Sequence, residues 1–169
     1  INNVVDISNY VMLETGQPLH FYDADRLGDT LEVRMANDME NLTTLDGEKR
    51  SLSNEDIVIS NGKDAIGLAG VMGGISTEIE NDTKNIIIES AIFDAAKIRY
   101  TSKKVLRSEA SNRFEKGLDP KRTYMALDRA CHLLKKYASG SVLKEKLEYK
   151  NISLDDKVID ITLEKINQV

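Results

Sequence analysis

The sequence feature that constrains the fold most is a run of three isoleucines at residues 86–88, followed directly by Glu89. β-Branched side chains favour strands, and an unbroken apolar run is typical of a strand that is covered on both faces. We therefore predict a buried strand over residues 85–91. Glu89 then lies at the end of a core strand, where its carboxylate either faces water or, if it is buried, needs a hydrogen-bonding partner.

Shorter strand patterns occupy much of the remaining chain. Alternating or β-branched segments predict strands at residues 31–35, 42–45, 48–52, 57–59, 65–72 and 142–149. Asp46 and Gly47 separate the second and third of these, and an Asp-Gly pair supplies the positive φ angles of a tight hairpin turn. The middle of the chain is therefore expected to be rich in strands.

The first predicted helix leads into a candidate site residue. Apolar residues at three- and four-residue spacing predict a helix over residues 4–15, which Gly16 ends. Because Pro18 disfavours the helical conformation for the residue before it, residues 17–20 are expected to form an extended turn. His20 then lies in a short loop just past a helix end, where it can point into a cleft.

Two more helices are predicted in the second half of the chain. Asp94 can cap a helix that runs to about Lys104. Asp119 and Pro120 can begin a helix that runs to about residue 138. The buried side of this last helix is expected to contain Tyr124, Leu127, Cys131 and Leu134. These helices and strands together predict an α/β (mixed α+β) fold with sheet layers and flanking helices.

The length of 169 residues suits one domain and the start of another. We predict a main domain over residues 1–150. Residues 151–169 are expected to begin the next domain, with a strand over residues 158–162 that leads into a helix. Because the first residue is Ile1 rather than Met, the chain is expected to be part of a longer protein.

Charge and composition exclude some classes of protein. The formal net charge of −5 argues against a domain that grips a long stretch of nucleic acid by charge alone, although it permits a pocket that receives only the tip of an RNA. No apolar run approaches the roughly 20 residues of a membrane span. A single cysteine cannot form an internal disulfide. A cytoplasmic protein without membrane association is therefore expected.

The common catalytic motifs are missing from the sequence. Two histidines and one cysteine do not make a zinc site, and the glycine-rich residues 70–74 lack the lysine of a phosphate loop. There is no G-x-S-x-G nucleophile elbow. His20 and Glu89 remain as candidate functional side chains. From the residues alone, each has an ordinary alternative, as a packed histidine and as a solvent-facing carboxylate.

Five stretches, taken together, give the chain a family resemblance. They are residues 3–12 (NVVDISNYVM), 16–20 (GQPLH), 68–74 (LAGVMGG), 89–93 (ESAIF) and 108–120 (SEASNRFEKGLDP). In this order and near this spacing they resemble the editing domain of the bacterial-type phenylalanyl-tRNA synthetase beta subunit. The resemblance covers about residues 1–140, and the tail after residue 151 is similar to the opening of the next domain of that subunit.

The resemblance implies a fold, an activity and partners. The fold would be a three-layer arrangement with a β-sandwich core of unusual topology. The parent enzyme would join phenylalanine to its tRNA with ATP and Mg²⁺, at an active site on an alpha subunit, in a heterotetramer of two alpha and two beta subunits. This domain would need no cofactor. It would receive the 3′ end of the tRNA and hydrolyse tyrosine that had been attached in error.

The resemblance also implies site residues. His20 and Glu89 match the positions that face the misattached amino acid in family members. Further pocket-lining positions match Ser8, Asn9, Pro18, Gly70, Ser108 and Ala110. Glu89 would accept a hydrogen bond from the tyrosine hydroxyl and Ala110 would leave room for the ring. His20 would position a water molecule or hold the terminal ribose, and backbone amides near Gly70 would hold the carbonyl oxygen.

The sequence departs from the family pattern at several positions. Ser8 and Ser108 stand where threonine is common, and both keep the hydroxyl. Phe21 and Tyr22 replace the more usual Ala-Phe that follows the histidine. Residues 103–107 are one residue short, which affects the register of the positions after them, and an arginine that the family places just upstream would precede the first residue.

Two other functions stay open at this level. A domain of the same fold can bind RNA or pack against other domains without catalysis, because a fold does not fix a function. The third hypothesis is an unrelated esterase. The sequence argues against it, because no recognisable set of nucleophile, base and orienting residue is present. The presence of His20 and Glu89 together with the small Ala110 favours the editing function.

Overall fold

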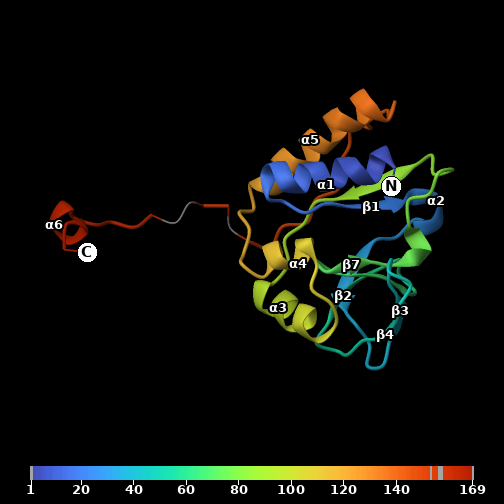
Figure 1. Ribbon diagram of the computed structural model, residues 1–169, viewed down its shortest axis with the longest axis horizontal. Coiled ribbons are helices and arrows are strands. Elements are labelled where there is room, and N and C mark those ends of the chain that lie inside the picture. The colour runs from blue at the N-terminus through green and yellow to red at the C-terminus, as the bar shows by residue number, and fades with distance from the viewer. Residues whose placement is uncertain (1, 153, 156–157, 169) are drawn as a thin grey trace.

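Two helices and a two-stranded ribbon form one side of the molecule (Figure 1). The computed structural model describes residues 2–152, 154–155 and 158–168. Helix α1 (Asn3–Thr15) packs beside α5 (Arg122–Tyr137), and the pair lies on the antiparallel ribbon of β1 (His20–Asp23) and β8 (Ile86–Glu89). Asn2 caps α1 by accepting a hydrogen bond from the Val5 N–H, and Gly16 ends the helix at φ 77°.

A second body of strands lies against the other face of this ribbon. Its four-stranded antiparallel sheet has the order β2-β5-β6-β7, formed by β2 (Glu32–Met35), β5 (Ile57–Ser60), β6 (Ala65–Leu68) and β7 (Met72–Gly73). A separate hairpin consists of β3 (Asn41–Thr43) and β4 (Lys49–Ser51). The short elements are α2 (Ala24–Leu27), a 3-10 turn (Ile75–Thr77), α4 (Glu109–Phe114) and α6 (Leu163–Ile166), and α3 (Ala95–Lys104) packs beside α4.

The alternation of side chains along β1 and β8 divides the core into layers. Phe21, Ile86 and Ile88 pack with the buried faces of α1 and α5. Tyr22 and Ile87 point the other way and pack with residues of β5 and β6. Since successive side chains of a strand face opposite sides, the ribbon is covered on both faces. A third cluster fills the space between the four-stranded sheet, the β3–β4 hairpin and the α3–α4 pair.

Many predicted elements are confirmed, including the mixed α and β class. The hairpin turns at Gly47 with φ 81°, and Asp94 caps α3 by accepting a hydrogen bond from the Lys97 N–H. The strand predicted over residues 85–91 is present as β8. Its isoleucines are only half-buried, because a two-stranded ribbon has open edges.

Three predicted element positions in the first 140 residues need correction. The extended turn expected over residues 17–20 ends in a strand, so that His20 lies on β1 rather than in a loop. The single strand expected over residues 65–72 is broken by a turn at Gly70, whose φ is 66°. Helix α5 begins two residues later than expected, at Arg122, because Asp119 caps a separate turn by accepting a hydrogen bond from the Lys121 N–H.

The buried face of α5 also differs from the prediction. Its fully buried residues are Ala126, Ala130, Leu133 and Leu134. Of the predicted set, Leu134 is buried, whereas Tyr124, Leu127 and Cys131 are half-buried. The contact with α1 is made by small alanines, which let the two helices approach closely, so the larger apolar side chains lie at its flanks.

The strands expected at residues 142–149 and 158–162 are absent. Leu143, Leu147 and Tyr149 are exposed, and no strand of the described residues pairs with this segment. A strand needs a partner edge for its backbone hydrogen bonds, and neither segment has one. The first segment is held instead by Glu148, whose carboxylate accepts a hydrogen bond from the Tyr124 hydroxyl. The proposed domain boundary near residue 150 stays a prediction.

Candidate active site

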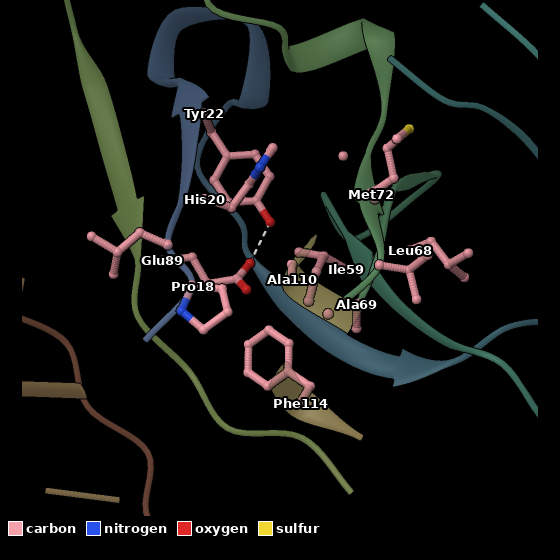
Figure 2. A pocket seen from close by; sticks show the side chains of 15 residues that line it. Pro18, His20, Tyr22, Ile59, Leu68, Ala69, Met72, Glu89, Ala110 and Phe114 are labelled. Atoms are coloured by element: carbon pink, nitrogen blue, oxygen red, sulfur yellow. Dashed lines mark hydrogen bonds between the residues drawn. The ribbon is translucent and has the colours of Figure 1, made fainter. Parts of the chain in front are cut away.

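A cavity of about 70 Å³ opens between the β1–β8 ribbon, the four-stranded sheet and α4 (Figure 2). It is lined by Pro18, Leu19, His20, Tyr22, Ile59, Gly67, Leu68, Ala69, Gly70, Val71, Met72, Gly73, Glu89, Ala110 and Phe114. Most of these side chains are apolar. The ionisable groups among them are His20, Tyr22 and Glu89, and all three come from the ribbon.

Strand register brings these three side chains together. His20 lies opposite Glu89 in the antiparallel pair, and Tyr22 lies opposite Ile87. His20, Tyr22 and Glu89 therefore share one face of the ribbon, with Tyr22 and Glu89 as diagonal neighbours. Tyr22 uses this position to donate a hydrogen bond from its hydroxyl to Oε2 of Glu89, drawn as the dashed line in Figure 2.

The cavity makes Glu89 an unusual carboxyl group. Burial raises the pKa of the Glu89 carboxyl from 4.5 to about 7, even though the hydrogen bond from Tyr22 acts in the opposite direction. Burial, together with the negative charge of Glu89, raises the pKa of the Tyr22 hydroxyl. Tyr22 is therefore a hydrogen-bond donor at any physiological pH, and the ionised form of Glu89 is a desolvated acceptor.

His20 is a neutral imidazole in this setting. Burial lowers the pKa of His20 from 6.5 to about 4. Its ring stands edge-on to the Tyr22 ring, with centroids 4.4 Å apart and an interplanar angle of 75°. On the other side it lies against the backbone of Gly73, where an added Cβ would come within 2.3 Å of His20 Cε1. Within the described residues neither ring nitrogen has a hydrogen-bond partner, so a nitrogen that faces the cavity can bind water or a ligand.

The turn at Gly70 lines the same cavity. The neighbouring N–H groups of Ala69 and Val71 donate to the Ile57 and Leu68 carbonyls, both at 3.0 Å. No acceptor for the Gly70 N–H is found in the part of the chain that the structure describes. The residue must be glycine here, because its φ is 66° and a Cβ would meet Phe114 at 3.0 Å.

Helix α4 closes the cavity with Ala110 and Phe114. The helix starts at Ser108, whose hydroxyl accepts a hydrogen bond from the Ser111 N–H at 3.0 Å and donates one to the Val71 carbonyl at 2.7 Å. This capping arrangement ties α4 to the turn that carries Gly70. Ala110 therefore has a fixed position on the wall, and its small side chain leaves space in front of it.

The structure brings together five of the eight residues predicted for the site. The residues that line the cavity are Pro18, His20, Gly70, Glu89 and Ala110. Ser108 lies behind the wall as the cap of α4. Ser8 and Asn9 lie on α1 and do not line the cavity, since Ser8 donates to the Val5 carbonyl and Asn9 is exposed. Their predicted role in binding substrate stays a prediction.

Two residues near the cavity were missed by the sequence reasoning. Tyr22 follows His20 by two positions, so it would have been found if residues 20–23 had been recognised as a strand. Gln17 is fully buried, and its side-chain amide donates to the Pro18 carbonyl at 3.0 Å and the Ala91 carbonyl at 2.9 Å. It thereby joins the chain segments that hold His20 and Glu89.

The chemical capacity of the site follows from these groups. A carboxyl group, a neutral imidazole and the turn at Gly70 surround a largely apolar space. Such a site can recognise a hydroxyl group on an apolar ligand and orient a water molecule. Among the described residues no cluster of His, Cys, Asp and Glu could hold a metal ion, and no helix is long and apolar enough to cross a membrane.

Comparisons with known proteins give the chain a family context. The profile of the B3/4 domain matches residues 1–139. The chain is 51% identical over 170 residues to the phenylalanine–tRNA ligase beta subunit of Staphylococcus epidermidis, and 53% identical to those of Staphylococcus haemolyticus and Staphylococcus aureus. Each of these alignments covers 99% of this chain and 21% of the relative. The chain thus spans about a fifth of the length of the curated relatives it matches.

Proposed function

We propose that this chain, which belongs to the B3/4 domain family, is the editing domain of a phenylalanine–tRNA ligase beta subunit. Its substrate is the phenylalanine tRNA that carries tyrosine in error, and its reaction is hydrolysis of the aminoacyl ester. The parent enzyme uses ATP and Mg²⁺ to attach phenylalanine and works with an alpha subunit. The similarity to three staphylococcal beta subunits supports this parentage.

The observation that carries the proposal is the carboxylate of Glu89 in a largely apolar cavity. A pocket made for phenylalanine has difficulty excluding an isostere that only adds a hydroxyl, and such rejection is worth roughly 10². A site that hydrogen-bonds the hydroxyl can reject a ligand without it by about 10⁴–10⁵. A second site with a hydroxyl acceptor therefore supplies the selectivity that the first site lacks.

The same cavity has groups for the hydrolytic step. The Gly70 N–H can donate to the carbonyl oxygen as negative charge develops on it. His20 binds the attacking water through a ring nitrogen. With a pKa near 4 the imidazole is a weak base, so its role is to position the water rather than to take its proton. The amino group or the neighbouring ribose hydroxyl of the substrate relays the proton of the water to the ribose oxygen that leaves as the ester bond breaks.

The test is deacylation of tyrosyl- and phenylalanyl-tRNA, both prepared on the phenylalanine tRNA, by the whole enzyme. Glu89→Ala is expected to lose hydrolysis of the tyrosyl ester by at least about 10²-fold, because the acceptor for the hydroxyl is gone. Glu32→Ala, which removes an exposed carboxylate from β2, is the matched control and should keep native rates. A native enzyme that does not hydrolyse tyrosyl-tRNA would refute the proposal in favour of a binding or structural domain.

A further inference from the structure

The hydroxyl acceptor of the cavity already has a partner within the chain. The Tyr22 hydroxyl donates to Oε2 of Glu89, as Figure 2 shows. Within the described residues Glu89 makes no other side-chain hydrogen bond. One carboxylate oxygen is therefore committed to a phenol from the protein, and Oε1 is left for a ligand.

Tyr22 is held too firmly to leave when a ligand enters. It is 1% exposed and belongs to the apolar cluster that contains Leu27, Ile59 and Ile66. The His20 ring also stands edge-on to it. A side chain packed this tightly in a strand has no second rotamer without opening the core. The phenol of a substrate must therefore share Glu89 with Tyr22 rather than replace it.

We propose that Tyr22 is a positioning and specificity-determining residue, which fixes the Glu89 carboxylate through Oε2 and leaves Oε1 as the acceptor for the phenol of the substrate. This inference rests on the proposed editing function. Glu89 would then accept hydrogen bonds from two phenols, that of Tyr22 on β1 and that of the substrate. Phenylalanine in the same place would leave Oε1 desolvated and without a donor.

The charge of Glu89 depends on the same contact. The ionisable groups that face Glu89 are His20 and Tyr22, both from β1, and among the described residues the sheet and α4 contribute none to the cavity. His20 is neutral above a pH of about 4, so no cation stabilises the carboxylate. The hydrogen bond from Tyr22 is the contact that opposes the effect of burial on the pKa of Glu89. Without it, Glu89 would stay protonated to higher pH.

The variant Tyr22→Phe removes the hydroxyl and keeps the ring that the core needs. We expect the ratio of tyrosyl to phenylalanyl hydrolysis by the whole enzyme to fall about tenfold at pH 7, which corresponds to about 1.4 kcal/mol. The acidic limb of the pH profile for tyrosyl hydrolysis should move up by about one pH unit, because the pKa of Glu89 rises. Tyr10→Phe, which removes an exposed hydroxyl from α1, is the control and should leave both unchanged.

Two results would overturn the inference. Faster tyrosyl hydrolysis by Tyr22→Phe at every pH would mean that Tyr22 competes with the substrate. If Tyr22→Phe keeps the native ratio of tyrosyl to phenylalanyl hydrolysis and the native pH profile, the Tyr22 hydroxyl has no positioning role and the side chain only fills space. Thermal unfolding of each variant, measured at the same pH values, separates both results from a loss of folded protein.

A binding measurement keeps this test separate from that of the proposed function. Tyrosinamide is titrated into the native enzyme, Tyr22→Phe and Glu89→Gln, and the binding that Glu89→Gln removes is assigned to the cavity. Should the native enzyme hydrolyse neither ester, the editing function fails, but weaker tyrosinamide binding by Tyr22→Phe would still support the positioning role. Equal binding by the native enzyme and Tyr22→Phe would overturn it.

Discussion

Glu89 should make the stability of the protein depend on pH in a way that Glu89→Gln abolishes. The pKa of this carboxyl is about 7 in the folded chain against an ordinary value of 4.5. Below pH 4.5 the group is protonated in both states and has no effect. Between pH 4.5 and 7 only the unfolded chain releases the proton, so the free energy of unfolding falls as pH rises. The loss is nearly complete about one pH unit above 7.

The magnitude follows from the separation of the two pKa values. One pKa unit corresponds to 1.36 kcal/mol, which gives about 3 kcal/mol for Glu89. The side chain is half-buried, and water reduces the effect, so we expect about 2–3 kcal/mol. Glutamine has nearly the same shape and does not ionise. Relative to the native chain, Glu89→Gln should therefore gain about 2–3 kcal/mol of stability between pH 4.5 and 8.

The assay is urea unfolding of both chains at pH values from 4.5 to 8.5, and the quantity that matters is the difference between them. The comparison of the two chains is needed because His20 also makes stability depend on pH. Its pKa of about 4 lies below the ordinary 6.5, so its contribution to stability falls as pH falls from 6.5 to 4. In the native chain the effects of His20 and Glu89 have opposite slopes and partly cancel. A difference that stays constant with pH would refute the burial of a chargeable carboxyl at this position.

Two further substitutions test the architecture around the site. Gly73→Ala would place a Cβ 2.3 Å from His20 Cε1 and push the ring away, so tyrosyl hydrolysis should fall at least about tenfold and stability by about 1–3 kcal/mol. Gly140→Ala, remote from the cavity and with contacts of 3.4 Å or more, is the control for deacylation, and a native rate in Gly73→Ala would contradict the placement of His20. Asp56 is fully buried and accepts hydrogen bonds from Thr101 at 2.7 Å and Lys104 at 2.9 Å, so Asp56→Ala should cost about 3 kcal/mol in urea unfolding while the tyrosyl to phenylalanyl ratio stays native. A loss below about 1 kcal/mol would mean that water replaces these contacts.

Features set by neighbouring residues could be predicted from the sequence. Gly16 ends α1, Gly47 turns the β3–β4 hairpin and Asp94 caps α3, because each depends on backbone angles or hydrogen bonds within a few residues. Such local rules hold whatever the rest of the chain does.

Features set by distant residues could not be predicted in this way. The four residues of β1 form a strand because β8, more than 60 residues later, supplies the edge. Residues 142–149 have the pattern of a strand but no edge to join. The alanines of α5 are buried because α1 lies against them, and an apolar pattern alone favours the larger side chains nearby.

The candidate site also combines features that the sequence predicts with features that only distant contacts determine. His20 and Glu89 were recognised as candidates from the sequence and the family resemblance, but their register opposite each other comes from the β1–β8 pair. Tyr22 is the clearest example, since its role depends on a diagonal contact with Glu89. No spacing in the sequence reveals that contact, because the two residues belong to strands from different parts of the chain.

The Tyr22–Glu89 pair also sets how much selectivity the proposed editing site can supply. With Oε2 engaged, a bound phenol makes one hydrogen bond to Oε1, and a hydrogen bond to a charged group is worth about 1.5–3 kcal/mol. This corresponds to roughly a ten- to hundredfold preference for tyrosine over phenylalanine from the acceptor alone. Any further selectivity must come from the position of the ester. Its carbonyl would reach the Gly70 N–H only when the ring of the substrate is held at Glu89. Ala110 and Gly70 contribute to the same cavity wall, so a ring that is not held at Glu89 would also leave the ester out of register. The ratio of kcat/KM for the tyrosyl ester to that for the phenylalanyl ester should therefore exceed the ratio of the affinities for tyrosinamide and phenylalaninamide. Equal ratios would show that Glu89 acts in binding only.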